Sequence, residues 1–169
     1  RVFHPTHVNR KRALFEEALD LTALGCTIDV TAFPVEEGED AWSAEDALGR
    51  YLDRKLPAHQ VTVSSDCGGC LPVFDADGVM THMDIGGPSE LLATVQRLVK
   101  AGRKLGDVLP AFTSNPARLL RLQNKGRLRS GADADLVILD ADLRLQSVMA
   151  MGKWHVQNGE QVLRGTFES

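Results

Sequence analysis

The chain has 169 residues, of which 43% are hydrophobic and 25% charged, a globular composition that excludes a disordered or fibrous protein. The net charge of -4 argues against a nucleic-acid partner, which would need a basic patch. No apolar run approaches the roughly 20 residues that cross a bilayer, so we expect no membrane partner either. Three cysteines make no disulfide framework, which predicts a reducing compartment such as the cytoplasm.

The first half of the chain alternates between strand and helix patterns. Residues 1–7 are typical of the end of a strand, and we expect the chain to be a piece of a longer protein because no partner strand precedes them. An apolar stripe at helical spacing predicts a helix that Gly25 ends, and Ser43 begins another. The predicted order is a helix over 11–24, a strand over 26–31, a loop over 32–40, a helix over 43–56 and a strand over 61–65. Such alternation indicates parallel strands joined by helices.

The second half changes character along its length. A long loop with a turn at Asp75–Gly78 leads to a helix over 90–101 that Ser89 caps. Shorter helices are predicted over 105–109 and 115–122, followed by a turn-rich segment over 125–135, strands over 136–140 and 146–151, and a hairpin over 153–164. The fold class is therefore α/β, with half of a parallel barrel in residues 1–124 and a small antiparallel sheet in residues 125–169.

Asp66 is the first candidate for chemistry. It follows the β-branched run Val61–Ser65, and Gly68 and Gly69 then allow a sharp turn. This places the carboxylate at the C-terminal end of a strand, where the active sites of α/β barrels lie. A strand-end aspartate that only caps a turn is the alternative.

His7 is the second candidate, because it also lies at a predicted strand end, and such ends converge on one mouth of a parallel barrel. A histidine and a carboxylate that converge there suit a hydrolytic zinc site. His4 competes with His7 for this role, three residues earlier in the chain. Arg10 is a candidate to bind a carboxylate through its guanidinium, with a plain surface arginine as the alternative.

The Cys67-Gly68-Gly69-Cys70 segment resembles half of a structural zinc site, but the second cysteine pair is missing. A redox role lacks a thioredoxin-like setting, so we interpret both cysteines as loop residues. His82 and His155 are interpreted as structural or surface residues.

The tail Gly126–Leu139 resembles the closing segment of the metal-dependent amidohydrolase superfamily, in which a (β/α)8 barrel precedes the strands of a small β-sandwich. Within that superfamily, residues 5–10 (Pro-Thr-His-Val-Asn-Arg), 25–31 and 64–66 closely resemble the isoaspartyl dipeptidases. The resemblance implies that the chain holds barrel strands six to eight with their helices, then sandwich strands.

The resemblance also implies a function, the zinc-dependent hydrolysis of β-aspartyl dipeptides. His7 would bind one zinc of a binuclear centre, and Asp66 would bind the other and transfer protons. Arg10 would hold a substrate carboxylate, and Cys70 stands where this family offers a serine to the substrate. A His-x-His pair, a carboxylated lysine and a further histidine would come from the N-terminal half of the barrel. We therefore expect the 169 residues alone to be inactive, and the complete enzyme to be a homo-oligomer.

Two alternatives remain. A cyclic amidase of the dihydropyrimidinase or dihydroorotase type would use a similar barrel, although Arg10 after His7 favours a dipeptide because a cyclic amide needs no extra carboxylate clamp. A non-catalytic assembly module would use the barrel half only as a scaffold.

Overall fold

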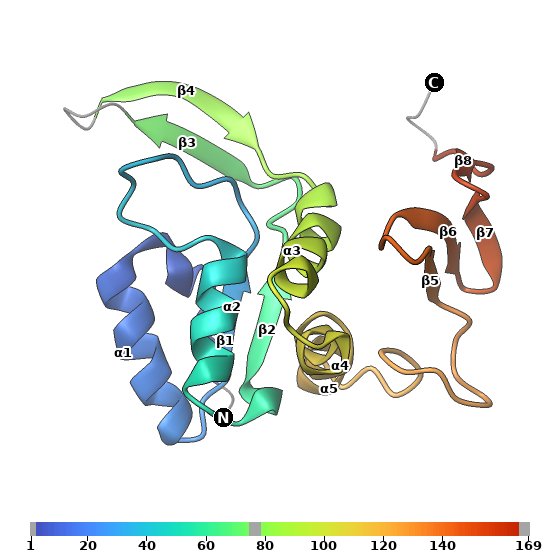
Figure 1. Ribbon diagram of the computed structural model, residues 1–169, viewed down its shortest axis with the longest axis horizontal. Coiled ribbons are helices and arrows are strands. Elements are labelled where there is room, and N and C mark those ends of the chain that lie inside the picture. The colour runs from blue at the N-terminus through green and yellow to red at the C-terminus, as the bar shows by residue number, and fades with distance from the viewer. Residues whose placement is uncertain (1–2, 75–78, 166–169) are drawn as a thin grey trace. The chain divides into compact units, whose positions relative to one another are not determined.

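The computed structural model describes residues 3–74 and 79–165 of a mixed α/β chain (Figure 1). The chain divides into two compact units, with the division between Pro116 and Ala117. The predicted boundary between barrel and sandwich, at residues 124 and 125, concerns the fold and not this division into compact units, so it stays a prediction.

The first unit alternates helices with two parallel strands. Its elements are the 3-10 helix η1 (Val8–Arg10), α1 (Arg12–Ala23), β1 (Ile28–Thr31), α2 (Ala44–Asp53), η2 (Ala58–Gln60), β2 (Val61–Ser64), β3 (Cys70–Phe74), β4 (Met80–Ile85), α3 (Ser89–Lys100), α4 (Leu105–Val108) and η3 (Leu109–Phe112). The helix α5 (Ser114–Leu119) spans the division between the units.

The parallel pair β1 and β2 organises the first unit. Ile28 pairs with Val61 and Val30 with Val63, and these four side chains join the apolar core with residues of α1, α2 and α3, among them Phe15, Leu48, Tyr51 and Leu98. Successive side chains of a strand point to opposite faces. Asp29, Thr31, Thr62 and Ser64 therefore lie on the face away from this core, and that face carries the candidate site.

The helix predictions are confirmed to within a few residues, and one cap is confirmed in detail. The hydroxyl of Ser43 accepts a hydrogen bond from the Asp46 amide at 3.1 Å and donates one to the Asp46 carboxylate at 3.0 Å. Ser89 was predicted to cap the next helix, and this was wrong: Ser89 is the first residue of α3, and Pro88 occupies the cap position with no side-chain hydrogen bond.

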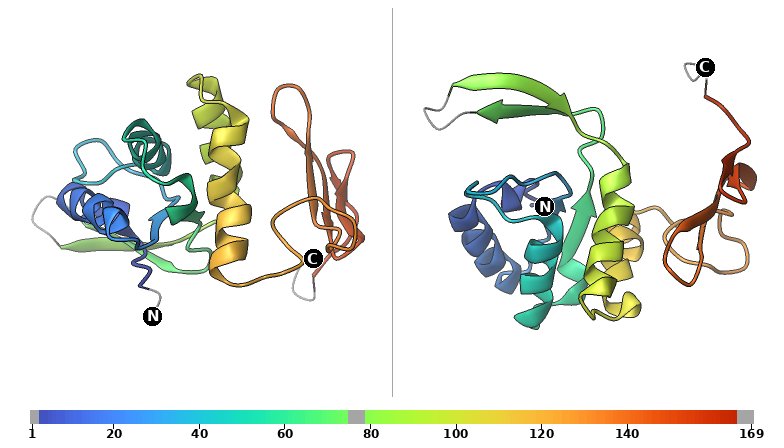
Figure 2. Two further views of the ribbon diagram at one scale, coloured as in Figure 1. Left: turned by 90° about the horizontal axis from the view of Figure 1, so that it is seen from below. Right: turned by 45° about the horizontal axis from the view of Figure 1, so that its top comes forward.

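Two further predictions of local structure were wrong. Residues 3–7 form no strand. The Asp29 amide donates to the Pro5 carbonyl at 2.9 Å, but Pro5 has no amide to extend the ladder. The segment expected as a long loop after Asp66 instead forms the antiparallel β3–β4 hairpin, a separate ribbon in Figure 2. The predicted turn at 75–78 lies outside the described residues.

The second unit contains an antiparallel sheet with the order β5-β6-β7-β8, as the tail of the sequence predicts. Its strands are β5 (Leu136–Leu139), β6 (Leu145–Ala150), β7 (Lys153–Gln157) and β8 (Glu160–Gln161). The last two strands turn at Asn158-Gly159, and both turn residues have positive φ, as a two-residue hairpin requires. None of the helices in the described part of the chain is long and apolar enough to cross a membrane.

Candidate active site

The backbone at His7 turns sharply, with a left-handed φ of 60°, and η1 begins at the next residue. The ring Nδ1 of His7 lies 2.7 Å from the hydroxyl of Thr31, the last residue of β1. If this nitrogen carries the proton and donates to Thr31, Nε2 has its lone pair free for a ligand. Metal-binding histidines commonly have their second ring nitrogen fixed in this way.

Asn9 holds the His7 turn against the end of β1. Its side chain is completely buried. The amide nitrogen donates to the carbonyls of Thr31 and Trp42 at 2.9 Å and 2.8 Å, and the side-chain oxygen accepts from the Thr31 amide at 2.8 Å. Asn9 therefore takes the place of a strand neighbour for Thr31, a role that was not predicted from the sequence.

Asp66 lies just beyond β2 in a tight loop. Its φ is 50°, and its carbonyl accepts from the Gly69 amide at 2.8 Å. The loop is fixed to the end of the hairpin, because the Gly68 amide donates to the Gly86 carbonyl and the Gly86 amide to the Gly69 carbonyl, both at 3.0 Å. A Cβ at Gly69 would lie 2.5 Å from Asp66 Oδ1. The carboxylate thus rests directly on the Gly69 backbone.

Arg10 connects the two candidate ligands. Its backbone amide donates to the His7 carbonyl at 3.1 Å, and its Nη2 donates to Asp66 Oδ2 at 3.0 Å. The guanidinium also lies over the Phe33 ring, 5.3 Å from the centroid. Residues 56 positions apart in the sequence are therefore joined by an ion pair, which the sequence alone did not predict.

The structure also places the other cysteines and histidines that the sequence analysis considered. Cys70 is exposed at the start of β3, where it pairs with Ile85, and Cys67 is exposed in the Asp66 loop. Both are free thiols, as is Cys26. His4, the competitor of His7, lies beside Thr27 at 2.8 Å and Thr62 at 3.4 Å, so it faces the strand hydroxyls rather than the Asp66 loop. His82 lies in β4 and not in a loop.

The donor set at this end of the strands fits a zinc ion in part. Imidazole nitrogen and carboxylate oxygen are common zinc ligands, and His7 and Asp66 supply one of each. Within residues 3–74 and 79–165, no three histidine, cysteine, aspartate or glutamate side chains gather closely enough to hold a metal ion. Further ligands would have to come from outside the described residues.

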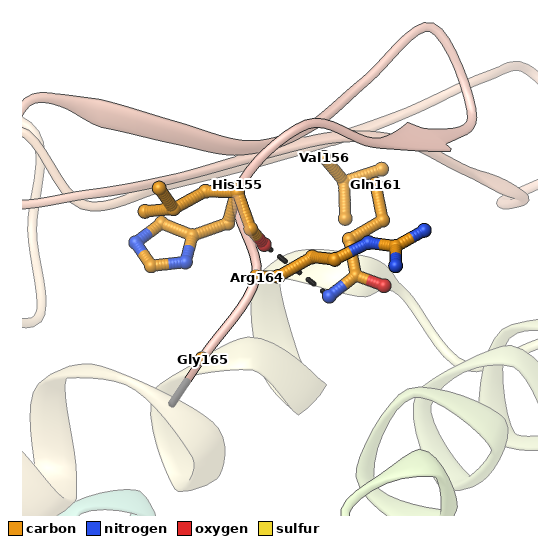
Figure 3. A pocket seen from close by; sticks show the side chains of 6 residues that line it. His155, Val156, Gln161, Arg164 and Gly165 are labelled. Carbon is orange, nitrogen blue, oxygen red and sulfur yellow. Dashed lines mark hydrogen bonds between the residues drawn. The ribbon is translucent and has the colours of Figure 1, made fainter. Parts of the chain in front are cut away.

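A cavity of about 460 Å³ lies in the second unit, between strands β7 and β8 and the residues that follow (Figure 3). Its lining includes His155, Gln161 and Arg164, and the Gln161 amide donates to the Leu163 carbonyl at 3.2 Å. None of the lining residues is a predicted site residue.

The characteristic sequence pattern of the amidohydrolase family matches residues 58–150, more than half of the chain. The chain belongs to the amidohydrolase family. Its fold is similar to that of β-aspartyl dipeptidase from Fervidobacterium islandicum AW-1, solved in complex with β-Asp-Leu dipeptide. The two share 33% identity over 96% of this chain and 42% of that chain, with a TM-score of 0.83.

Deacetylases of the same broad fold are also similar. The chain is 32% identical over 97 residues to N-acetylglucosamine-6-phosphate deacetylase from Lysinibacillus sphaericus. This match covers 54% of this chain and 24% of that protein. The corresponding enzyme from Pasteurella multocida shares 15% identity with a TM-score of 0.53, which shows the fold alone. The chain spans less than half the length of these dipeptidase and curated deacetylase relatives.

Proposed function

We propose that this chain is the C-terminal half of a zinc-dependent hydrolase that cleaves β-aspartyl dipeptides. The observation that carries the proposal is the ion pair between Arg10 and Asp66, because Arg10 follows His7 by three residues and is hydrogen-bonded to its carbonyl through the backbone. The similarity to the Fervidobacterium dipeptidase supports it, because that similarity extends over 96% of the chain.

Each residue has a role that its contacts support. His7 would offer Nε2 to a metal while Thr31 fixes its other ring nitrogen. Asp66 would bind metal, accept a proton from the attacking water and return it to the leaving amine, so that one group serves as base and then acid. Bound zinc would supply Lewis-acid chemistry and lower the pKa of water.

Arg10 would bind a carboxylate of the substrate. A guanidinium has five N–H donors, and among the described residues only Nη2 donates to a side chain, that of Asp66. The other N–H donors of Nη1 and Nη2 suit a second carboxylate, which a dipeptide carries and dihydrouracil lacks. Cys70 would contact the substrate from the start of β3, as a weaker hydrogen-bonding group than serine.

The wider architecture belongs to this proposal. Residues 1–124 would supply barrel strands six to eight and residues 125–169 the sandwich strands. The N-terminal half of the barrel would add the His-x-His pair, the carboxylated lysine and the further histidine. The complete enzyme would be a cytoplasmic homo-oligomer. A zinc titration of the 169 residues alone should show no pair of tight, stoichiometric sites.

A sugar-phosphate deacetylase is the second candidate, because the Lysinibacillus relative is 32% identical to part of this chain. That similarity covers 54% of the chain, against 96% for the dipeptidase. Assays of the complete protein with β-Asp-Leu, N-acetylglucosamine-6-phosphate and dihydrouracil separate the dipeptidase, the deacetylase and the cyclic amidase.

Substitution of Asp66 tests the catalytic role directly. Asp66→Asn should lower kcat for β-Asp-Leu by at least about 10³-fold, because it removes both a ligand and the proton acceptor. The control is Asp84→Asn, which changes an exposed carboxylate of β4 and should leave kcat unchanged. Activity that survives in Asp66→Ala would instead support an assembly module.

A further inference from the structure

A buried carboxyl group lies below the candidate site. Asp29, the second residue of β1, is only 4% exposed. Its Oδ1 accepts a hydrogen bond from the Thr62 hydroxyl at 2.5 Å. Its Oδ2 accepts from the hydroxyls of Ser64 at 2.6 Å and Thr6 at 2.8 Å. Among the described residues, no arginine, lysine or histidine forms an ion pair with it.

The three hydroxyls belong to the segments that carry the candidate ligands. Thr6 immediately precedes His7, and Ser64 lies two residues before Asp66. On β1 itself, Thr31 shares the face of Asp29 and contacts the His7 ring at 2.7 Å. One carboxyl group therefore holds the chain within two residues of both His7 and Asp66.

We propose that Asp29 is a positioning residue of the hydrolytic site, which fixes the separation of His7 and Asp66 by joining three chain segments. This inference rests on the proposed function. A carboxylate suits the task because each oxygen can accept two hydrogen bonds, so a single side chain receives hydroxyls from both sides. An asparagine in the same place loses at least one acceptor.

A contribution to stability does not by itself explain an aspartate at position 29. An apolar side chain on a buried strand usually stabilises a protein more than a carboxyl group that lacks a cation. Residues that break such a rule are expected at functional sites. The geometry of a reaction site is sensitive to small shifts, and a displacement of about 1 Å can cost about 10²-fold in rate.

The test compares Asp29 with a matched buried residue in the complete protein. Asn115 is also 4% exposed, and its amide donates to the carbonyls of Ala58 at 2.7 Å and Val61 at 2.8 Å, at the opposite end of β2. Asn115→Ala removes a comparable number of hydrogen bonds far from Asp66. It should lower Tm yet keep kcat within about threefold of the wild type.

Asp29→Ala should lower kcat for β-Asp-Leu by about 10²-fold, with KM within about threefold. Zinc affinity, measured by chelator competition, should fall by about 10-fold or more, as for other groups that support metal ligands. Asp29→Asn should recover part of both losses because it keeps the shape and one acceptor. An Asp29→Ala protein with the kcat and zinc affinity of Asn115→Ala would overturn the inference.

Ser64→Ala decides the question if Asp29→Ala does not fold. It deletes one hydroxyl beside the Asp66 loop, so kcat should fall about threefold to tenfold with a loss of Tm no larger than that of Asn115→Ala, and an unchanged kcat would overturn the inference. A wild-type protein that does not cleave β-Asp-Leu refutes the proposed function, and zinc affinity then remains the measure for Asp29.

Discussion

The adjacent glycines Gly68 and Gly69 offer the sharpest test of how the Asp66 carboxylate is positioned. A Cβ added at Gly69 would lie 2.5 Å from Oδ1 of Asp66, 2.6 Å from its Cγ and 2.8 Å from its Oδ2. At Gly68, nothing lies within 4 Å of an added Cβ, but φ is 79°. An alanine at Gly69 therefore meets the carboxylate, whereas an alanine at Gly68 meets only backbone strain.

The expected magnitudes follow from these distances. Ordinary contacts between heavy atoms lie near 3.5 Å, so Gly69→Ala must displace the carboxylate by about 1 Å. Asp66 can rotate away at little cost in stability, but a shift of this size costs about 10²-fold in rate. Gly68→Ala places a Cβ in the left-handed region at a cost of roughly 1–2 kcal/mol, which lowers Tm by a few degrees.

The assay measures kcat for β-Asp-Leu and Tm for both variants of the complete protein. Gly69→Ala should lose about 10²-fold in kcat and keep its Tm, whereas Gly68→Ala should keep most of its kcat and lose Tm. The reasoning is wrong if Gly69→Ala retains the wild-type kcat, or if the two variants lose activity in proportion to stability.

Three more outcomes test the wider interpretation. Arg10→Lys should raise KM for β-Asp-Leu about 10-fold with a smaller effect on kcat, because lysine cannot bind a carboxylate bidentately; equal KM values would refute the clamp. Cys70→Ser should lower KM a few-fold in the same assay, since a hydroxyl is the stronger hydrogen-bonding group. A hydrogen bond from Lys125 lowers the pKa of Asp135, so this pair stabilises the chain above the ordinary aspartate pKa. The stabilisation is lost as pH falls through the lowered pKa, and Lys125→Met should remove this part of the acid dependence of Tm.

The sequence predicts those elements that are determined by neighbouring residues of the chain or by one apolar face that packs on the core. The helices from residue 11 to 56 follow from an apolar stripe and a Ser43 cap, which are local signals. The β3–β4 hairpin was missed because all six residues of β4 are exposed. Such a strand has no alternation between buried and exposed positions, and proline, which stands at position 72 within β3, is uncommon inside strands.

In the candidate site, too, local signals could be predicted from the sequence and contacts between distant segments could not. Asp66 could be selected because it follows a strand that the structure contains. His7 was selected as the end of a predicted strand, although residues 3–7 form none. The ion pair of Arg10 with Asp66 could not be predicted, because it depends on two loops that only the folded chain brings together. Asp29 was missed because a single aspartate in a short strand is common, and its significance comes from hydroxyls 23 to 35 residues away.

The register of β1 against β2 determines both the stability of the first unit and the geometry of the candidate site. Ile28 pairs with Val61 and Val30 with Val63 on the core face, while Asp29 pairs with Thr62 and Thr31 with Ser64 on the other. Because side chains alternate with a period of two, a slip of one residue in either strand would bring its polar residues into the apolar core. The hydrophobic effect therefore selects a single register, and that register places the Asp29 carboxyl between the hydroxyls that adjoin His7 and Asp66. The precision of the polar face is thus a consequence of the packing on the apolar face.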